Sequence, residues 1–149
     1  MLRSFLIYIS KAAWAQRLVT SWNFAWRAAS RFVAGSTIQD AIIAVRELND
    51  RGINVTLDHL GESTATREDA IRATEDILEL LDQINKADVQ ANVSVKLTQI
   101  GLALAEDLCK QNLERILARA GEYKNFVRID MEDSSYTERT IHLFQQMRT

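Results

Sequence analysis

Residues 93–97 read VSVKL, a run in which valines alternate with a serine and a lysine. This alternation predicts a β-strand with two unlike faces, because successive side chains of a strand point to opposite sides. Ser94, Lys96 and the following Thr98 share one face, and the other face carries Val93, Val95 and Leu97. The strand therefore has a polar face with a cation and an apolar face suited to packing.

Two further runs of this kind lie on either side of the first. Residues 53–57 (INVTL) and 126–131 (FVRIDM) contain β-branched residues and predict strands. Helical segments separate the runs: one follows Thr66 and Asp69, which have capping-box spacing, and the other covers residues 105–120, with Gly121 as its stop. Strands joined through helices of this length form a parallel sheet.

A last helix follows the third strand. Ser135 and Glu138 have capping-box spacing and open a helix that runs through Ile141, Phe144 and Met147. Eight such βα units would give the roughly 250 residues of a TIM barrel. We expect an α/β fold of the (βα)8 TIM-barrel family, here an incomplete barrel with N-terminal helices plus three βα units. A complete small open α/β domain is the alternative.

The N-terminal part has a different pattern. Residues 1–35 predict a helical arm, since four large apolar side chains recur at four-residue steps: Trp14, Leu18, Trp22 and Trp26. Gly35 ends this pattern, and Thr37 is predicted to be the N-cap of a helix that ends before Gly52. We expect two domains, the arm at 1–35 and the first part of a barrel at 36–149.

Composition excludes several classes of protein. The chain has 149 residues and a formal net charge of −2, so it lacks the basic field that nucleic acid binding requires. Its single cysteine, Cys109, excludes an internal disulfide and a CxxC metal site. A membrane-spanning helix needs about 20 consecutive apolar residues, and the sequence contains no such run. A reducing compartment such as the cytoplasm fits these features.

Polar side chains gather where each predicted strand ends. The first strand is followed by Asp58, His59 and Glu62, the second carries Lys96, and the third carries Asp130. In parallel βα folds the carboxyl ends of the strands form the mouth in which active sites lie. Lys96 and Asp130 are therefore expected to face one cavity from neighbouring strands.

Three chemistries are compatible with these residues. Lys96 could pair with a small carboxylated substrate, or it could act as a Schiff-base nucleophile, as lysines on barrel strands do in aldolases. A divalent metal held by Asp58, His59, Glu62 and Asp130 is the third hypothesis, although no HxH or HExxH spacing supports it.

Several polar residues have simpler interpretations. Glu132 and Asp133 are typical of loop or first-turn acids, because carboxylates favour helix N-termini. His59 fits a packed ring at a strand end, His142 fits a helix surface, and Cys109 fits a filler position in the middle of a helix. Lys96 itself could be a structural lysine paired with Asp130, and Glu62 a loop residue before a helix.

Three segments at the strand ends carry a family resemblance. TLDHLGES (56–63), VSVKLTQIGL (93–102) and VRIDMEDSSYT (127–137) resemble the bacterial single-function proline dehydrogenases, in the same order and at similar spacing. Residues 13–35 resemble the helical arm of that family. The resemblance covers essentially the whole chain and identifies it as an N-terminal fragment of such a protein.

The resemblance implies a fold, a cofactor and roles for four residues. The family has a βα barrel with FAD at its mouth and oxidises L-proline to pyrroline-5-carboxylate. By resemblance, Lys96 pairs with the substrate carboxylate, and Asp130 is the active-site acid that orients its neighbours. The backbone of Met131 contacts the flavin, and Glu62 pairs with a substrate-binding arginine. No metal is implied.

The resemblance also implies partners. The expected partners are L-proline and a quinone electron acceptor, with peripheral contact at the inner face of a membrane. No nucleic acid partner is expected. Since the arginines that grip the substrate belong to the last helix of that family, we expect residues 1–149 alone to be inactive and free of flavin. The competing functions are a lysine-dependent barrel aldolase or lyase and a non-catalytic helical interaction module.

Overall fold

The structure is a computed structural model that describes residues 34–35, 37–60 and 64–148. The chain divides into two compact units, residues 1–41 and residues 42–149. Almost all of the predicted arm lies outside the described residues, as does Glu62. The predicted domain boundary between residues 35 and 36 stays a prediction.

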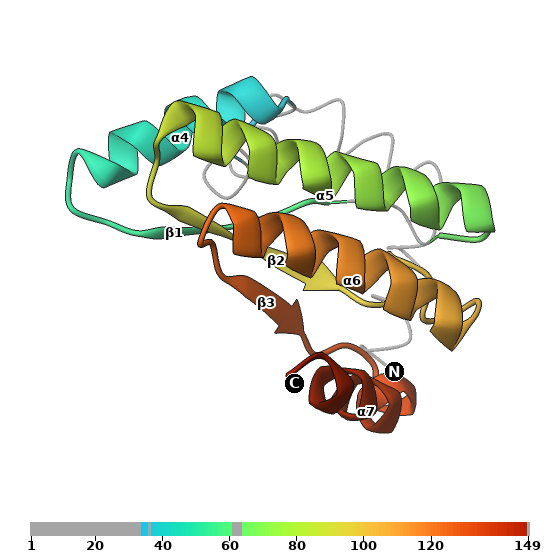
Figure 1. Cartoon of the computed structure of the whole chain (residues 1–149). Helices are drawn as coiled ribbons and strands as arrows, with labels where there is room; N and C mark the ends of the chain where they lie inside the picture. Colours follow the sequence, from blue (N-terminus) through green and yellow to red (C-terminus); the bar gives the residue numbers. More distant parts are fainter. Residues whose placement is uncertain (1–33, 36, 61–63, 149) are drawn as a thin grey trace, which may run out of the picture. The chain divides into compact units, whose positions relative to one another are not determined.

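Helices and strands alternate along the described chain (Figure 1). Their order is α4 (Ile38–Asn49), β1 (Val55–Asp58), α5 (Arg67–Ala87), β2 (Ala91–Lys96), α6 (Glu106–Glu122), β3 (Val127–Asp130), the 3-10 helix η1 (Ser134–Tyr136) and α7 (Thr137–Met147). The strands form a parallel sheet in the order β1-β2-β3, and α5 and α6 lie side by side over one face of it. The predicted three βα units are confirmed.

Register fixes which strand residues are neighbours. Asp58 of β1 lies opposite Ser94 of β2, and Lys96 of β2 lies opposite Asp130 of β3. Partners in register point to the same side of a sheet, so these residues share the face away from the two helices. On β2 the other face is apolar and covered, with Val93, Val95 and Leu97 each at most 1% exposed.

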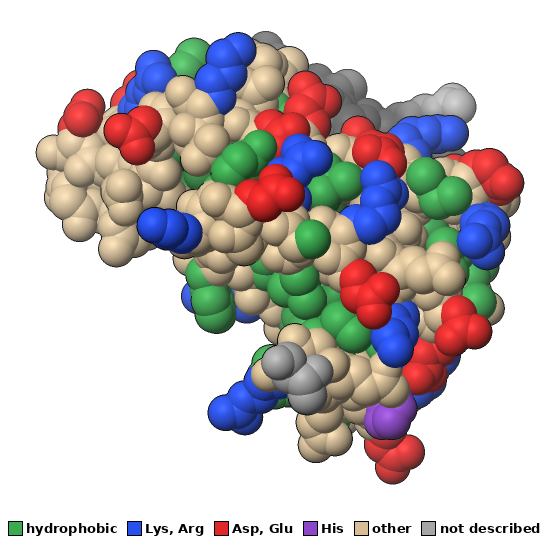
Figure 2. All heavy atoms as spheres, viewed as in Figure 1, with side chains coloured by type: hydrophobic (Ala, Val, Ile, Leu, Met, Phe, Trp, Pro, Cys, Tyr) green, Lys and Arg blue, Asp and Glu red, His purple; other side chains and the backbone are tan. Residues whose placement is uncertain are grey.

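The core lies between this apolar sheet face and the two long helices. Helix α5 contributes Ile77, Leu81 and Ile84, and α6 contributes Leu113 and Ile116, all at most 2% exposed. Burying one such side chain contributes about 1.5–3 kcal/mol to folding. Acidic and basic side chains alternate over the outer surfaces of α5 and α6 (Figure 2), as solvent-facing helices require.

Two predicted helix starts are confirmed, one of them in each unit. In the first unit, Asp40 donates its backbone N–H to the Thr37 hydroxyl at 3.1 Å. In the second, Thr66 and Asp69 form a reciprocal capping box at the start of α5. Gly52 adopts a left-handed φ of +74° in the turn after α4, where glycine avoids the strain that a Cβ would cause.

Two other predicted boundaries are wrong. Helix α6 runs through Gly121 to Glu122, and the left-handed residue that ends the segment is Lys124, with φ +53°. Ser135 and Glu138 do not form a capping box, because the Asp133 carboxylate accepts the Ser135 N–H at 2.9 Å and starts η1 instead. Helix α7 then begins without a side-chain cap.

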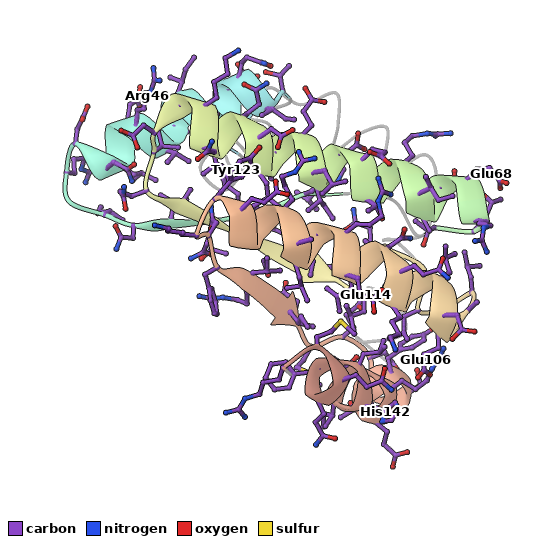
Figure 3. The ribbon with its side chains drawn as sticks, viewed as in Figure 1. Arg46, Glu68, Glu106, Glu114, Tyr123 and His142 are labelled. Carbon is purple, nitrogen blue, oxygen red and sulfur yellow. The ribbon has the colours of Figure 1, made fainter. Side chains whose placement is uncertain are left out.

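An ion pair and a contact with a histidine link the start of α6 to α7. Glu106 accepts from Arg139 Nε at 3.4 Å, and its other oxygen lies 4.0 Å from His142 Nε2 (Figure 3). These contacts hold α7, which follows β3 in the chain, against the start of α6. His142 is 60% exposed, as expected for a surface residue. Within the described ranges, no helix combines the length and apolarity needed to cross a membrane.

Candidate active site

The last residues of the three strands meet at the carboxyl end of the sheet. These residues are Asp58 of β1, Lys96 of β2 and Asp130 of β3. Lys96 Nζ lies 3.3 Å from Asp130 Oδ2 and also donates to Asp58 Oδ2. The side chains are 34–38% exposed, so the cluster is open to a small molecule from solvent. The predicted meeting of Lys96 and Asp130 is confirmed.

A buried hydroxyl holds Asp130 in place. Ser94 Oγ, on a residue only 5% exposed, donates a hydrogen bond to Asp130 Oδ1. This hydrogen bond, together with that from Lys96, lowers the pKa of Asp130 below its ordinary value and outweighs the opposing effect of burial. Asp130 is therefore an anchored carboxylate that stays ionised at neutral pH.

Lys96 stays protonated. Burial acts to lower the pKa of Lys96, but hydrogen bonds and charge from Asp58 and Asp130 outweigh it and raise the pKa. A Schiff-base nucleophile requires the opposite shift, since only the neutral amine attacks a carbonyl. The geometry thus favours an ammonium that binds an anion over an amine that forms an imine.

A second set of hydrogen bonds ties the loops at the mouth together. Glu132 accepts from both the backbone N–H of Thr98, at 3.0 Å, and its hydroxyl. Thr64 in turn donates its hydroxyl to the Thr98 carbonyl at 2.7 Å. Loops after all three strands are joined in this way, which limits how far Lys96 and Asp130 can separate. Glu132 therefore joins two loops through Thr98, whereas its sequence position predicted only a loop or first-turn acid.

The remaining candidates lie at or away from the mouth. Met131 directly follows Asp130 and is 58% exposed. His59 Nδ1 lies 3.2 Å from Gln99 Nε2, which also donates to the His59 carbonyl at 3.1 Å, so this ring packs at a strand end as expected. Cys109 is fully buried, and burial raises the pKa of its thiol to about 12, so it is a core residue.

Metal binding finds little support among the described side chains. In that part of the chain, no three histidine, cysteine or carboxylate side chains lie close enough to hold an ion. Of the predicted ligands, Asp58 and Asp130 both contact Lys96 instead. The fourth, Glu62, lies outside the described residues, so its part in a metal site stays a hypothesis.

Sequence reasoning missed two features of the cluster. It paired Lys96 with Asp130 but did not pair it with Asp58, which belongs to β1 rather than to the loop after it. The sequence also placed Ser94 on the polar face of its strand but did not predict that it bonds to Asp130. The signal for both was available in the alternation of β1 and β2, but only the register shows which residues come within reach of one another.

Parallel strands with converging polar ends define this chain as a βα-barrel type of protein with a candidate anion site at the mouth. A solved structure of proline utilization A from Bdellovibrio bacteriovorus, inactivated by N-propargylglycine, supports this fold. It superimposes with a TM-score of 0.75 over 82% of this chain and 15% of its own, at 21% identity. The chain has part of that TIM-barrel type of fold.

The family model for proline dehydrogenase matches residues 41–149. The chain belongs to the proline dehydrogenase family. It is 32% identical over 146 residues to proline dehydrogenase 2 of Bacillus subtilis, covering 98% of this chain and 48% of the relative. It is 40% identical over 118 residues to proline dehydrogenase 1 of the same species, covering 79% of this chain and 39% of the relative. A Deinococcus radiodurans proline dehydrogenase is 36% identical over 125 residues, covering 82% and 40%. The chain thus spans about half the length of these relatives, or less.

Proposed function

We propose that this chain supplies the first three βα units of an FAD-dependent proline dehydrogenase, which oxidises L-proline to pyrroline-5-carboxylate. The observation that carries the proposal is the Lys96 ammonium, held at the carboxyl ends of the strands between two carboxylates. Family membership supports the reaction. The charge and exposure of Lys96 support its use for a small anionic group.

Lys96 binds the substrate carboxylate in this proposal. L-Proline is a zwitterion, and a charge-assisted hydrogen bond from an ammonium is among the strong ways to hold its carboxylate. Lysine is a point charge without the two-pronged geometry of arginine, so it would act together with guanidinium groups from elsewhere in the full barrel. Asp130, anchored by Ser94, keeps the Lys96 ammonium aimed at the mouth.

The mouth suits a flavin in two respects. Met131 is more than half exposed and directly follows the anchored Asp130, and the family resemblance assigns its backbone a contact with the flavin. The neighbouring ammonium would hold a substrate beside that ring. When bound, FAD supplies the acceptor for the hydride that leaves proline. Glu62 would pair with a substrate-binding arginine, a role that rests on the family resemblance alone.

The electron acceptor and the location of the protein are further parts of the proposal. A quinone would reoxidise the flavin, which implies a cytoplasmic protein with peripheral contact at the inner face of the membrane. Both parts rest on the family resemblance.

The test is expression from the complete reading frame that contains this sequence, in parallel with residues 1–149 alone. The longer product should show flavin absorbance and proline-dependent dye reduction, whereas residues 1–149 alone should show neither. Absence of proline-dependent reduction in a flavin-loaded longer product would overturn the proposed reaction. Activity of residues 1–149 alone would overturn the prediction that these residues need the rest of the barrel to bind flavin and substrate.

Two rival functions give different results in the same preparation. A lysine-dependent aldolase or lyase would form an imine on Lys96 that borohydride traps, and the raised pKa of Lys96 argues that no adduct forms. An interaction module would lose partner binding on deletion of residues 1–34 without any change in redox chemistry. The proposed dehydrogenase predicts neither result.

A further inference from the structure

The two carboxylates that contact Lys96 are held very differently. Asp130 has one oxygen on the buried Ser94 hydroxyl and the other on Lys96. Among the described residues, Lys96 is the one partner of the Asp58 carboxylate. Asp58 also reaches Lys96 diagonally, because its partner in register is Ser94, two residues before Lys96. In the described part of the chain, Asp58 is therefore held by one contact, whereas Asp130 has a second anchor that would keep it in place.

We propose that Asp58 is a specificity-determining residue that occupies the carboxylate-binding position on Lys96 in the free protein and leaves it when a substrate carboxylate binds. This inference rests on the proposed function for the identity of the substrate. It assigns to Asp58 a competing role, distinct from the anchored, supporting role of Asp130. A ligand without a carboxylate would gain nothing from the exchange.

Charge around Lys96 supports the exchange. Asp58, Lys96 and Asp130 carry one positive and two negative charges, and Arg128, whose charge acts on Asp130, adds a second positive charge nearby. An added carboxylate on Lys96 is repelled by the Asp58 carboxylate while Asp58 stays in place. Removing the charge of Asp58 removes both a competitor and a repulsive neighbour. With the cluster about one third exposed to water, the screened interaction of two charges about 5 Å apart corresponds to roughly a three- to tenfold change in affinity.

The experiment measures binding of acetate, the simplest carboxylate, at Lys96. Protein labelled with carbon-13 lysine is titrated with sodium acetate at constant ionic strength, and the Lys96 side-chain resonance is identified by its absence in Lys96→Arg. Asp58→Asn should bind acetate about three- to tenfold more tightly than the wild type. Equal or weaker binding in Asp58→Asn would overturn the exchange, because a purely structural role for Asp58 predicts loss rather than gain.

A matched control separates local from global charge. Asp50 lies in the exposed turn before β1, at the opposite end of the strand from Asp58. Asp50→Asn changes net charge by the same amount and should leave acetate affinity unchanged. An equal gain in Asp50→Asn would attribute the effect to net charge and also overturn the proposal.

Kinetics in the product of the complete reading frame test the substrate. Asp58→Asn should lower KM for L-proline about three- to tenfold, and should not lower KM for L-prolinamide, which carries only the ammonium charge. If neither compound is oxidised, the proposed function fails, while the acetate titration still decides the role of Asp58. If the KM of both compounds changes equally, the exchange fails and the proposed function stands.

Discussion

Replacing Ser94 with alanine tests the anchoring of Asp130. The buried Ser94 hydroxyl donates to an ionised carboxylate, and a hydrogen bond to a charged group contributes about 1.5–3 kcal/mol. Because the Asp130 side chain is 34% exposed, water replaces part of this interaction. We therefore expect Ser94→Ala to lower the free energy of unfolding by about 1–1.5 kcal/mol at pH 7.

The loss should depend on pH with a definite sign. The pKa of Asp130 is lowered in the folded protein from its ordinary value of 3.8. A carboxyl with a lowered folded pKa contributes stability that is present above the unfolded pKa and is lost as pH falls through the folded pKa. The difference between wild type and Ser94→Ala should therefore be full at pH 7 and shrink below about pH 4.

Urea unfolding followed by circular dichroism from pH 7 to pH 3 measures this difference. Thr74→Val is the matched control, since the buried Thr74 hydroxyl donates at 2.8 Å to the neutral carbonyl of Ala70. Its cost should be independent of pH. A Ser94→Ala cost that does not change with pH would refute the reasoning that Ser94 acts on an ionised Asp130.

Three further predictions concern the scaffold. Thr66→Ala removes the capping box with Asp69 and should cost about 1 kcal/mol in urea unfolding, with the slope unchanged; a loss near zero would refute the cap. Cys109 should react with a thiol reagent only after unfolding, because it is fully buried and its pKa is raised to about 12; rapid labelling of the native protein would contradict this. Gly101→Ala should lower the melting temperature, since Gly101 has φ +113° and an added Cβ would lie 3.0 Å from Leu108; an unchanged melting temperature would show that the turn tolerates a side chain.

The fold was largely predictable because its signals are local. Alternation in residues 93–97 marks a strand with one polar and one apolar face, and helical periodicity marks the crossovers. The pairing of Lys96 with Asp130 followed from the same alternation together with the parallel order of the strands. These features depend on periods of two and 3.6 residues, which a single sequence displays directly.

The features that were missed depend on single hydrogen bonds and backbone angles, which periodicity does not encode. Gly121 reads as a helix stop, but the helix continues past it, and a lysine adopts the left-handed conformation at residue 124. The Ser135 N–H bonds to Asp133, two residues before it, and this local competition displaces the predicted capping box. The contact between Asp58 and Lys96 is diagonal across two strands, so residue spacing alone could not indicate it.

The most direct test of the account is the pKa of Lys96, measured by nuclear magnetic resonance on lysine-labelled protein. An ammonium held between two strand-end carboxylates should titrate above the ordinary lysine value of 10.5. In Asp130→Asn the pKa should fall, because one stabilising charge is lost. A wild-type pKa below 10.5 would contradict the account and favour a lysine used as a nucleophile.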